Sequence, residues 1–185
     1  MSTKVLSLPT PIVGIRPRTL SALAATAAAV AFPQAFHLAG IAAGAGPAFA
    51  QAWLPMFVPV MLVGLLAGPS VGAITGVAGP LVAYALTGMP APALLPIVAV
   101  ELVACGVVAG VVSGKRLAAA WATLLVVVAA PVASFAVESA VGLIGGSGLA
   151  SAVGTWWAQW VVTGPGLILQ VAAVAITLAV IRRHR

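Results

Sequence analysis

Long apolar runs, separated by short breaks rich in glycine and proline, set the pattern of the whole chain. The clearest case is residues 54–90, where two apolar runs flank Ala67-Gly68-Pro69-Ser70 and no residue is charged. A helix rises about 1.5 Å per residue, so an apolar run of about 17 to 25 residues crosses a hydrocarbon core about 30 Å thick. The pattern therefore predicts two short transmembrane helices joined by a tight turn.

The same pattern predicts an all-α integral membrane protein with six transmembrane helices. Their expected bounds are residues 20–36, 53–67, 70–86, 93–113, 117–142 and 156–181. We divide the chain into a cytoplasmic basic leader at residues 1–18, a membrane domain at 19–182 and a cytoplasmic tail at 183–185. A cleavable signal peptide is the alternative for the start of the chain, but its apolar run continues for a full span. Residues 37–52 hold three glycines and a proline, which predicts a loop.

Composition agrees with a membrane protein, because 63% of the residues are hydrophobic and only 5% are charged. The net charge of +6 does not indicate nucleic-acid binding, since every Lys and Arg lies at the end of an apolar run. A single cysteine, Cys105, excludes an internal disulfide.

Basic residues predict the orientation in the membrane. With six crossings and a cytoplasmic N-terminus, all eight lie inside, as the positive-inside rule requires. They are Lys4, Arg16, Arg18, Lys115, Arg116, Arg182, Arg183 and Arg185. The outer loops, residues 37–52, 87–92 and 143–154, then contain none.

The polar candidates extend from the middle of the predicted membrane domain, at Glu101, to its outer end, at Glu138. Glu101 and Glu138 are the only acids of the chain, and a carboxyl inside a membrane is expensive unless it is paired or protonated. Each has a plain structural alternative: a protonated, hydrogen-bonded Glu101 and a hydrated, interfacial Glu138. The prolines of three helices, Pro80, Pro131 and Pro165, fall at similar depth, which favours a cavity over unrelated kinks.

A second set of candidates comes from residues 155–166, TWWAQWVVTGPG. Helical spacing puts Trp156, Trp160 and Thr163 on one face, where with Gln159 they offer a stacking wall and an amide for a planar heterocycle. Interfacial anchoring is the alternative for at least one tryptophan. His37 and Gln51, in the outer loop expected above them, complete the predicted substrate-binding residues.

The first apolar run is rich in alanine, which allows another helix to approach closely. The pairs Ala24/Ala28 and Ala25/Ala29 have the small-xxx-small spacing of such contacts, although an alanine-rich composition also produces it by chance. Nothing indicates catalysis, a cofactor or a metal site: the chain has no Asp, two separated histidines and no phosphate-binding glycine loop.

Several short motifs resemble the substrate-binding S component of energy-coupling factor (ECF) vitamin transporters. They are Pro55-Met56-Phe57-Val58-Pro59-Val60, Leu65-Leu66-Ala67-Gly68-Pro69, Gly72, Pro80-Leu81, Thr87-Gly88-Met89-Pro90, Glu101-Leu102, Gly106 and Gly110. The resemblance covers about residues 20–182 and is most specific over 55–110. It departs at Phe57, where relatives often have His.

The resemblance implies six helices in a bacterial cytoplasmic membrane and capture of a vitamin or precursor from outside. It also implies a transmembrane T component and two ABC ATPases as partners, with the alanine pairs of the first helix as the docking motif. Cobalamin and benzimidazole precursors, pyrimidine or pyridine vitamins and pantothenate remain open, whereas the glycine-rich signature of the biotin-specific branch is not evident. One alternative is a passive channel or assembly subunit. Another is an intramembrane enzyme, but the paired acids or histidine clusters that such an enzyme needs are missing.

Overall fold

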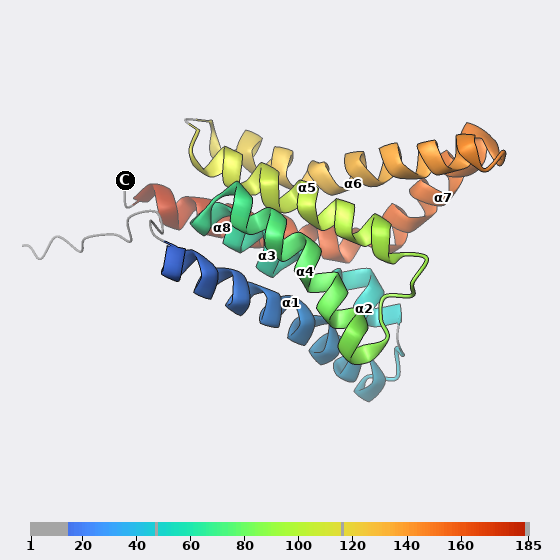
Figure 1. Ribbon diagram of the computed structural model, residues 1–185, viewed down its shortest axis with the longest axis horizontal. Helices are drawn as coiled ribbons and strands as arrows, with labels where there is room; N and C mark the ends of the chain where they lie inside the picture. The colour runs from blue at the N-terminus through green and yellow to red at the C-terminus, as the bar shows by residue number, and fades with distance from the viewer. Residues whose placement is uncertain (1–14, 47, 116, 184–185) are drawn as a thin grey trace, which may run out of the picture.

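The computed structural model describes residues 15–46, 48–115 and 117–183, and within them the chain forms helices and turns without a strand (Figure 1). The helices are α1 (Ile15–Ala42), α2 (Ala48–Trp53), α3 (Phe57–Ala67), α4 (Pro69–Thr87), α5 (Leu95–Ser113), α6 (Ala119–Ile144), α7 (Gly148–Val162) and α8 (Gly164–Arg183). Six stretches are long and apolar enough to cross a membrane: α1, α2 with α3, α4, α5, α6 and residues Gly164–Ile181 of α8. The prediction of an all-α membrane protein with six apolar spans is confirmed.

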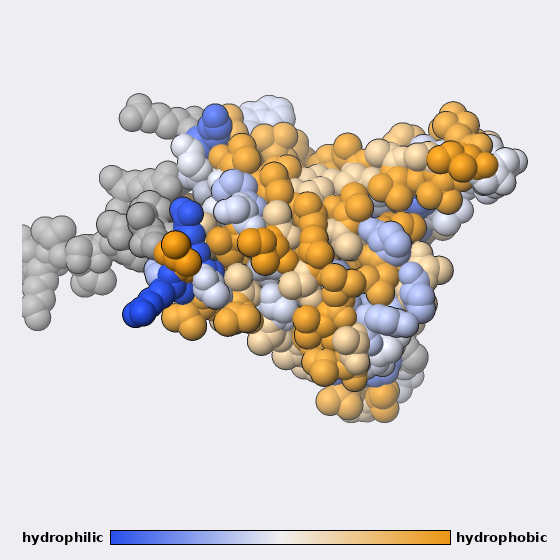
Figure 2. All heavy atoms as spheres, viewed as in Figure 1, coloured by the Kyte–Doolittle hydropathy of each residue, from blue (hydrophilic) through white to orange (hydrophobic). Residues whose placement is uncertain are grey.

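The helices run side by side along the long axis of the molecule. In Figure 1 the start of α1, the end of α5, the start of α6 and the end of α8 all lie at the left end. We call this the basic end, because Arg16, Arg18 and Lys115 belong to it, and the opposite end the far end. Figure 2 shows hydrophobic side chains over most of the visible face between the two ends, as a lipid-facing exterior requires.

Glycines bring the central helices into backbone contact. Helix α5 packs against α3, α4 and α6. Gly106 of α5 lies so close to Gly72 of α4 that a Cβ on Gly106 would meet the Gly72 carbonyl oxygen at 2.6 Å. One turn away, a Cβ on Gly76 would lie 2.7 Å from the Val103 nitrogen. The spacing of Gly72 and Gly76 is the small-xxx-small pattern of close helix pairs in membranes.

The loop predicted at residues 37–52 is wrong. Helix α1 continues to Ala42 and α2 occupies Ala48–Trp53. Gly40 does not break α1, because its missing side chain makes room for α2: a Cβ there would lie 2.7 Å from Phe49. Phe36, Phe49 and Trp53 hold the hairpin together, with ring centroids 5.9 to 6.1 Å apart.

The single helix predicted at residues 156–181 is also wrong, because the chain ends one helix at Val162 and begins another at Gly164. Pro165 has no N–H with which to continue the hydrogen bonds of α7, so it starts α8 instead of kinking a longer helix. Much of the loop expected at 143–154 belongs to α7.

The start of the chain needs a smaller correction. Helix α1 includes residues 15–18, which the sequence assigned to the leader. A Pro at the third position of a helix is tolerated, because the first N–H groups have no intrahelical partner. The rest of the leader and the last two residues of the tail lie outside the described residues.

Candidate functional site

Three helices bring polar side chains together inside the apolar bundle, in the half nearer the far end. Glu101 lies on the second turn of α5 and is only 2% exposed. Its Oε1 accepts a hydrogen bond of 3.4 Å from the side-chain amide of Gln159 on α7. Ser134 of α6 lies beside the same carboxyl. With Trp156 and Trp160 these residues form what we call the polar cluster.

The two tryptophans of the cluster reach α6 through their indole N–H groups. Trp160 donates to the Ser134 hydroxyl over 3.4 Å, and Trp156 donates to the Pro131 carbonyl over 2.8 Å. The Trp156 ring also meets Phe135 edge to face, with centroids 5.3 Å apart. Aromatic pairs of this geometry add to the energy of burial. The α6–α7 contact is therefore both aromatic and polar.

Local sequence explains why these groups face one another. Trp156, Gln159 and Trp160 are spaced three and four residues apart, so they share one face of α7. Trp157, one residue around the helix, is 63% exposed, and its ring lies beside that of Trp156 with centroids 6.3 Å apart. On α6, the Pro131 carbonyl accepts both the Trp156 indole and the Ser134 hydroxyl, which donates over 3.2 Å.

The other predicted substrate-binding residues lie in different settings. Glu138 is close enough to Glu101 for their carboxyls to interact electrostatically, and its Oε2 is buried without a hydrogen-bond partner. The Thr163 hydroxyl donates to the backbone carbonyls of Gln159 and Trp160, so it closes the end of α7. Among the described residues, no hydrogen bond or ring contact joins His37 on α1 or Gln51 on α2 to the polar cluster.

Sequence reasoning missed four buried polar residues: Thr75, Thr123, Ser134 and Gln170. Ser134 belongs to the cluster itself. Gln170 of α8 is fully buried with both amide atoms unpartnered, and Thr75 of α4 is fully buried with an unpartnered hydroxyl. A signal for Gln170 was present, because it is the one amide in the apolar run 164–181. Buried polar groups without partners are rare, and each needs an explanation such as water or a ligand.

The alanines of α1 divide between the interior and the surface. Ala29 is fully buried, and a Cβ on Gly79 of α4 would lie 3.3 Å from its side chain. Ala25 packs against a small cluster of α3 and α4 residues. Ala24 is exposed, and Ala25 and Ala28 both line a groove of about 260 Å³ between α1 and α3. Of the two pairs, Ala24/Ala28 is the one without a fully buried member.

Neither of two well-formed hollows on the molecule is lined by the polar cluster. One is the α1–α3 groove, and the other is a cavity of about 540 Å³ between α5 and α6 at the basic end. In the described part of the chain, no three His, Cys, Asp or Glu residues lie together in a way that could hold a metal ion.

Comparison with models of protein families, with curated proteins and with solved structures finds no match. The evidence for a membrane protein and for the polar cluster therefore comes from the chain's own sequence and structure.

Proposed function

We propose that the chain is the substrate-capturing S component of an ECF-type importer, with the polar cluster as the place where a vitamin-like molecule binds. The observation that supports this most is Glu101, an acid buried in an apolar bundle and bonded to Gln159. An intramembrane carboxyl is costly, so its presence favours a functional role. The resemblance of residues 55–110 to that family supports the same proposal independently.

The chemistry of the cluster favours an uncharged or cationic planar ligand. The described basic side chains, Arg16, Arg18 and Lys115, belong to the basic end, so the cluster has no cation to pair with an anionic group. It offers a carboxyl, an amide and a hydroxyl beside two indole rings. A flat ring with a donor and an acceptor on its edge would stack on Trp160 and replace Gln159 on Glu101.

In this proposal the basic end faces the cytoplasm of a bacterial cell and the far end faces outside. The ligand enters from the far end, and a transmembrane T component with two ATPases supplies the energy. The T component docks on the exposed side of α1 at Ala24 and Ala28, where small side chains permit close approach.

The test is to purify the full chain, identify any small molecule released on denaturation by mass spectrometry, and titrate that compound back by calorimetry. Glu101→Gln and Trp160→Ala should each weaken binding, by about tenfold or more for the acid and less for the ring. A charged hydrogen bond is worth about 1.5–3 kcal/mol and a stacking contact about 0.5–1.5 kcal/mol.

Trp157→Ala is the matched control, because it removes a neighbouring, mostly exposed tryptophan that makes no hydrogen bond to the cluster among the described residues. Thermal melts of all three variants separate lost affinity from lost folding. If no compound co-purifies and no vitamin-like compound binds the chain, the passive-subunit alternative replaces the proposal. Unchanged affinity with a lowered melting temperature would make Glu101 a structural residue.

A further inference from the structure

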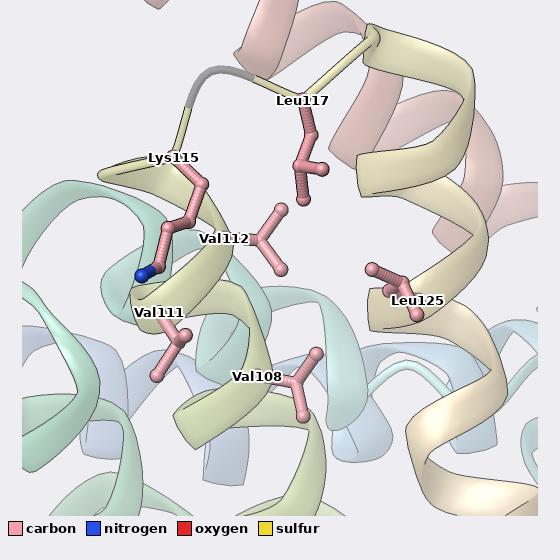
Figure 3. Close-up of a pocket in the computed structure, with 6 residues that line it drawn as sticks. All are labelled: Val108, Val111, Val112, Lys115, Leu117 and Leu125. Carbon is pink, nitrogen blue, oxygen red and sulfur yellow. The ribbon is translucent and has the colours of Figure 1, made fainter.

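A hollow between α5 and α6 at the basic end has the form of a site for an amphiphile. It has a volume of about 540 Å³ and is lined by Val108, Val111, Val112, Lys115, Leu117 and Leu125. Figure 3 shows Val112, Leu117 and Leu125 pointing into the space below the α5–α6 turn. Val111 and Leu125 are each nearly half exposed, so the hollow opens on the surface of the bundle, where lipid would lie.

Every side chain that lines this hollow is aliphatic except one. Lys115 lines the hollow, and in Figure 3 its side chain runs back along α5 with the ammonium group toward Val111. No carboxylate side chain neutralises it, because the only acids are Glu101 and Glu138. Glu101 lies fourteen residues away along α5, which is about 20 Å of helix. The rim of the hollow therefore carries a positive charge that no described acidic side chain neutralises.

The start of α6 adds to the positive potential beside the same hollow. The first N–H groups of a helix have no intrahelical partner and favour anions. Here the N-cap residue is Ala118, which has no side-chain cap, and the first turn contains no acid. Trp121 in that turn is exposed, as is typical of tryptophan at the level of the lipid headgroups.

We propose that this hollow binds one anionic phospholipid. An acyl chain lies against Val108, Val112 and Leu125, and the phosphate meets Lys115 at the rim. Basic pockets between transmembrane helices are suited to anionic headgroups, and each basic residue near the membrane surface contributes about 1 kcal/mol. This inference concerns a different end of the molecule from the polar cluster and does not depend on the proposed function.

Native mass spectrometry of the full chain tests the proposal without any variant. The protein is released from detergent micelles that contain equal amounts of phosphatidylglycerol and phosphatidylcholine with the same acyl chains. We expect one phosphatidylglycerol to remain bound and phosphatidylcholine to be lost. Equal retention of the two lipids, or retention of neither, would overturn the proposal.

Two pairs of variants then locate the lipid. Leu125→Trp fills the hollow and should abolish the retained phosphatidylglycerol, whereas Leu124→Trp, at a neighbouring and similarly exposed position outside the hollow, should not. Lys115→Ala should lower the apparent affinity about fivefold, as the loss of about 1 kcal/mol predicts. Arg18→Ala removes a positive charge from the same end without touching the hollow and should have little effect.

Three further outcomes would count against the proposal. Retention that is unaffected by Leu125→Trp would place the lipid elsewhere. Displacement of the lipid by millimolar inorganic phosphate would mean that the site recognises the anion and not the lipid. A dimer that Leu125→Trp converts to monomer, without any lipid preference, would show that a second copy of the chain covers the hollow.

Discussion

At the scale of single residues, Trp156 links α7 to Pro131 of α6, which lies 25 positions earlier in the sequence. Its indole N–H donates to the Pro131 carbonyl of α6 over 2.8 Å, and its ring packs against Phe135. The same carbonyl accepts the Ser134 hydroxyl, which in turn receives the Trp160 indole. One backbone oxygen therefore anchors the chain of hydrogen bonds that positions α7.

Replacing this anchor should loosen the far end of the molecule. Trp156→Phe keeps an aromatic ring but removes the N–H donor, so we expect the free energy of unfolding to fall by about 1 kcal/mol. That corresponds to about 2–4 °C in melting temperature for a chain of this size. A thermal melt in detergent measures it. Trp157→Phe makes the same chemical change at an exposed position and should melt like the wild type; equal losses in both variants would contradict the role of the hydrogen bond.

The sequence predicts the candidate site in part. Glu101 stands out because acids are rare in membrane helices, and the tryptophans stand out through their spacing. Ser134 does not, because a serine in an apolar helix gives no sign of which neighbour it meets. Gln159 and Glu101 are 58 positions apart in the sequence. Their hydrogen bond forms only because α7 packs against α6. Sequence pattern alone does not contain that packing.

At the scale of helices, the crossing of α4 and α5 is set by missing side chains. Membrane helices gain little from burying apolar surface against one another, so close packing decides which helices associate. Gly72 faces Gly106, Gly76 faces Val103, and Gly110 reaches the backbone at Pro69, which joins α4 to α5 over about two turns. Any side chain at these glycines would push the two backbones apart.

Gly106→Ala tests this crossing directly. The new Cβ would lie 2.6 Å from the Gly72 carbonyl oxygen and 2.7 Å from its carbonyl carbon, and neither backbone atom can move aside cheaply. We expect a loss of about 1–3 kcal/mol in stability, read as a lower melting temperature or a lower yield of monodisperse protein. Gly154→Ala on α7 is the control, because nothing lies within 4 Å of its new Cβ. A Gly106→Ala protein as stable as the control would show that the helices can separate without cost.

The sequence predicts helix boundaries well where an apolar run ends at a turn. It predicts them poorly where a glycine makes room for a neighbouring helix or a proline begins a new one. The bounds of α4 and α5 lie within two residues of those expected. The sequence predicts a loop around Gly40, whereas Gly40 lies within α1 and admits Phe49 of α2. It also predicts one helix that runs through Pro165, whereas Pro165 lies in the first turn of α8. A glycine that breaks a helix and one that accommodates a neighbour look the same in sequence, because only the tertiary contact distinguishes them.

At the scale of the whole molecule, the two ends differ in both charge and shape. The basic end carries Arg16, Arg18 and Lys115, whereas the far end is uncharged apart from Glu138 near the end of α6. In Figure 1 the α6–α7 hairpin and the α1–α2 hairpin diverge toward the far end, and Figure 2 shows a notch between them. A molecule with such ends has a defined direction in a membrane, and the basic end is expected on the cytoplasmic side.

Cysteine labelling in intact cells decides that direction. In a Cys105→Ala background, Met89→Cys places a thiol in the exposed α4–α5 turn at the far end, and Gly114→Cys places one beside Lys115 at the basic end. A Cβ at Gly114 meets nothing closer than 3.8 Å, and the substitution keeps all eight basic residues that should set the orientation. We expect a membrane-impermeant maleimide to label Met89→Cys in intact cells and Gly114→Cys only after the cells are opened. The opposite labelling pattern would mean that the molecule has the reverse orientation, with the polar cluster nearer the cytoplasm. Labelling of both sites from outside would contradict the six-span arrangement itself.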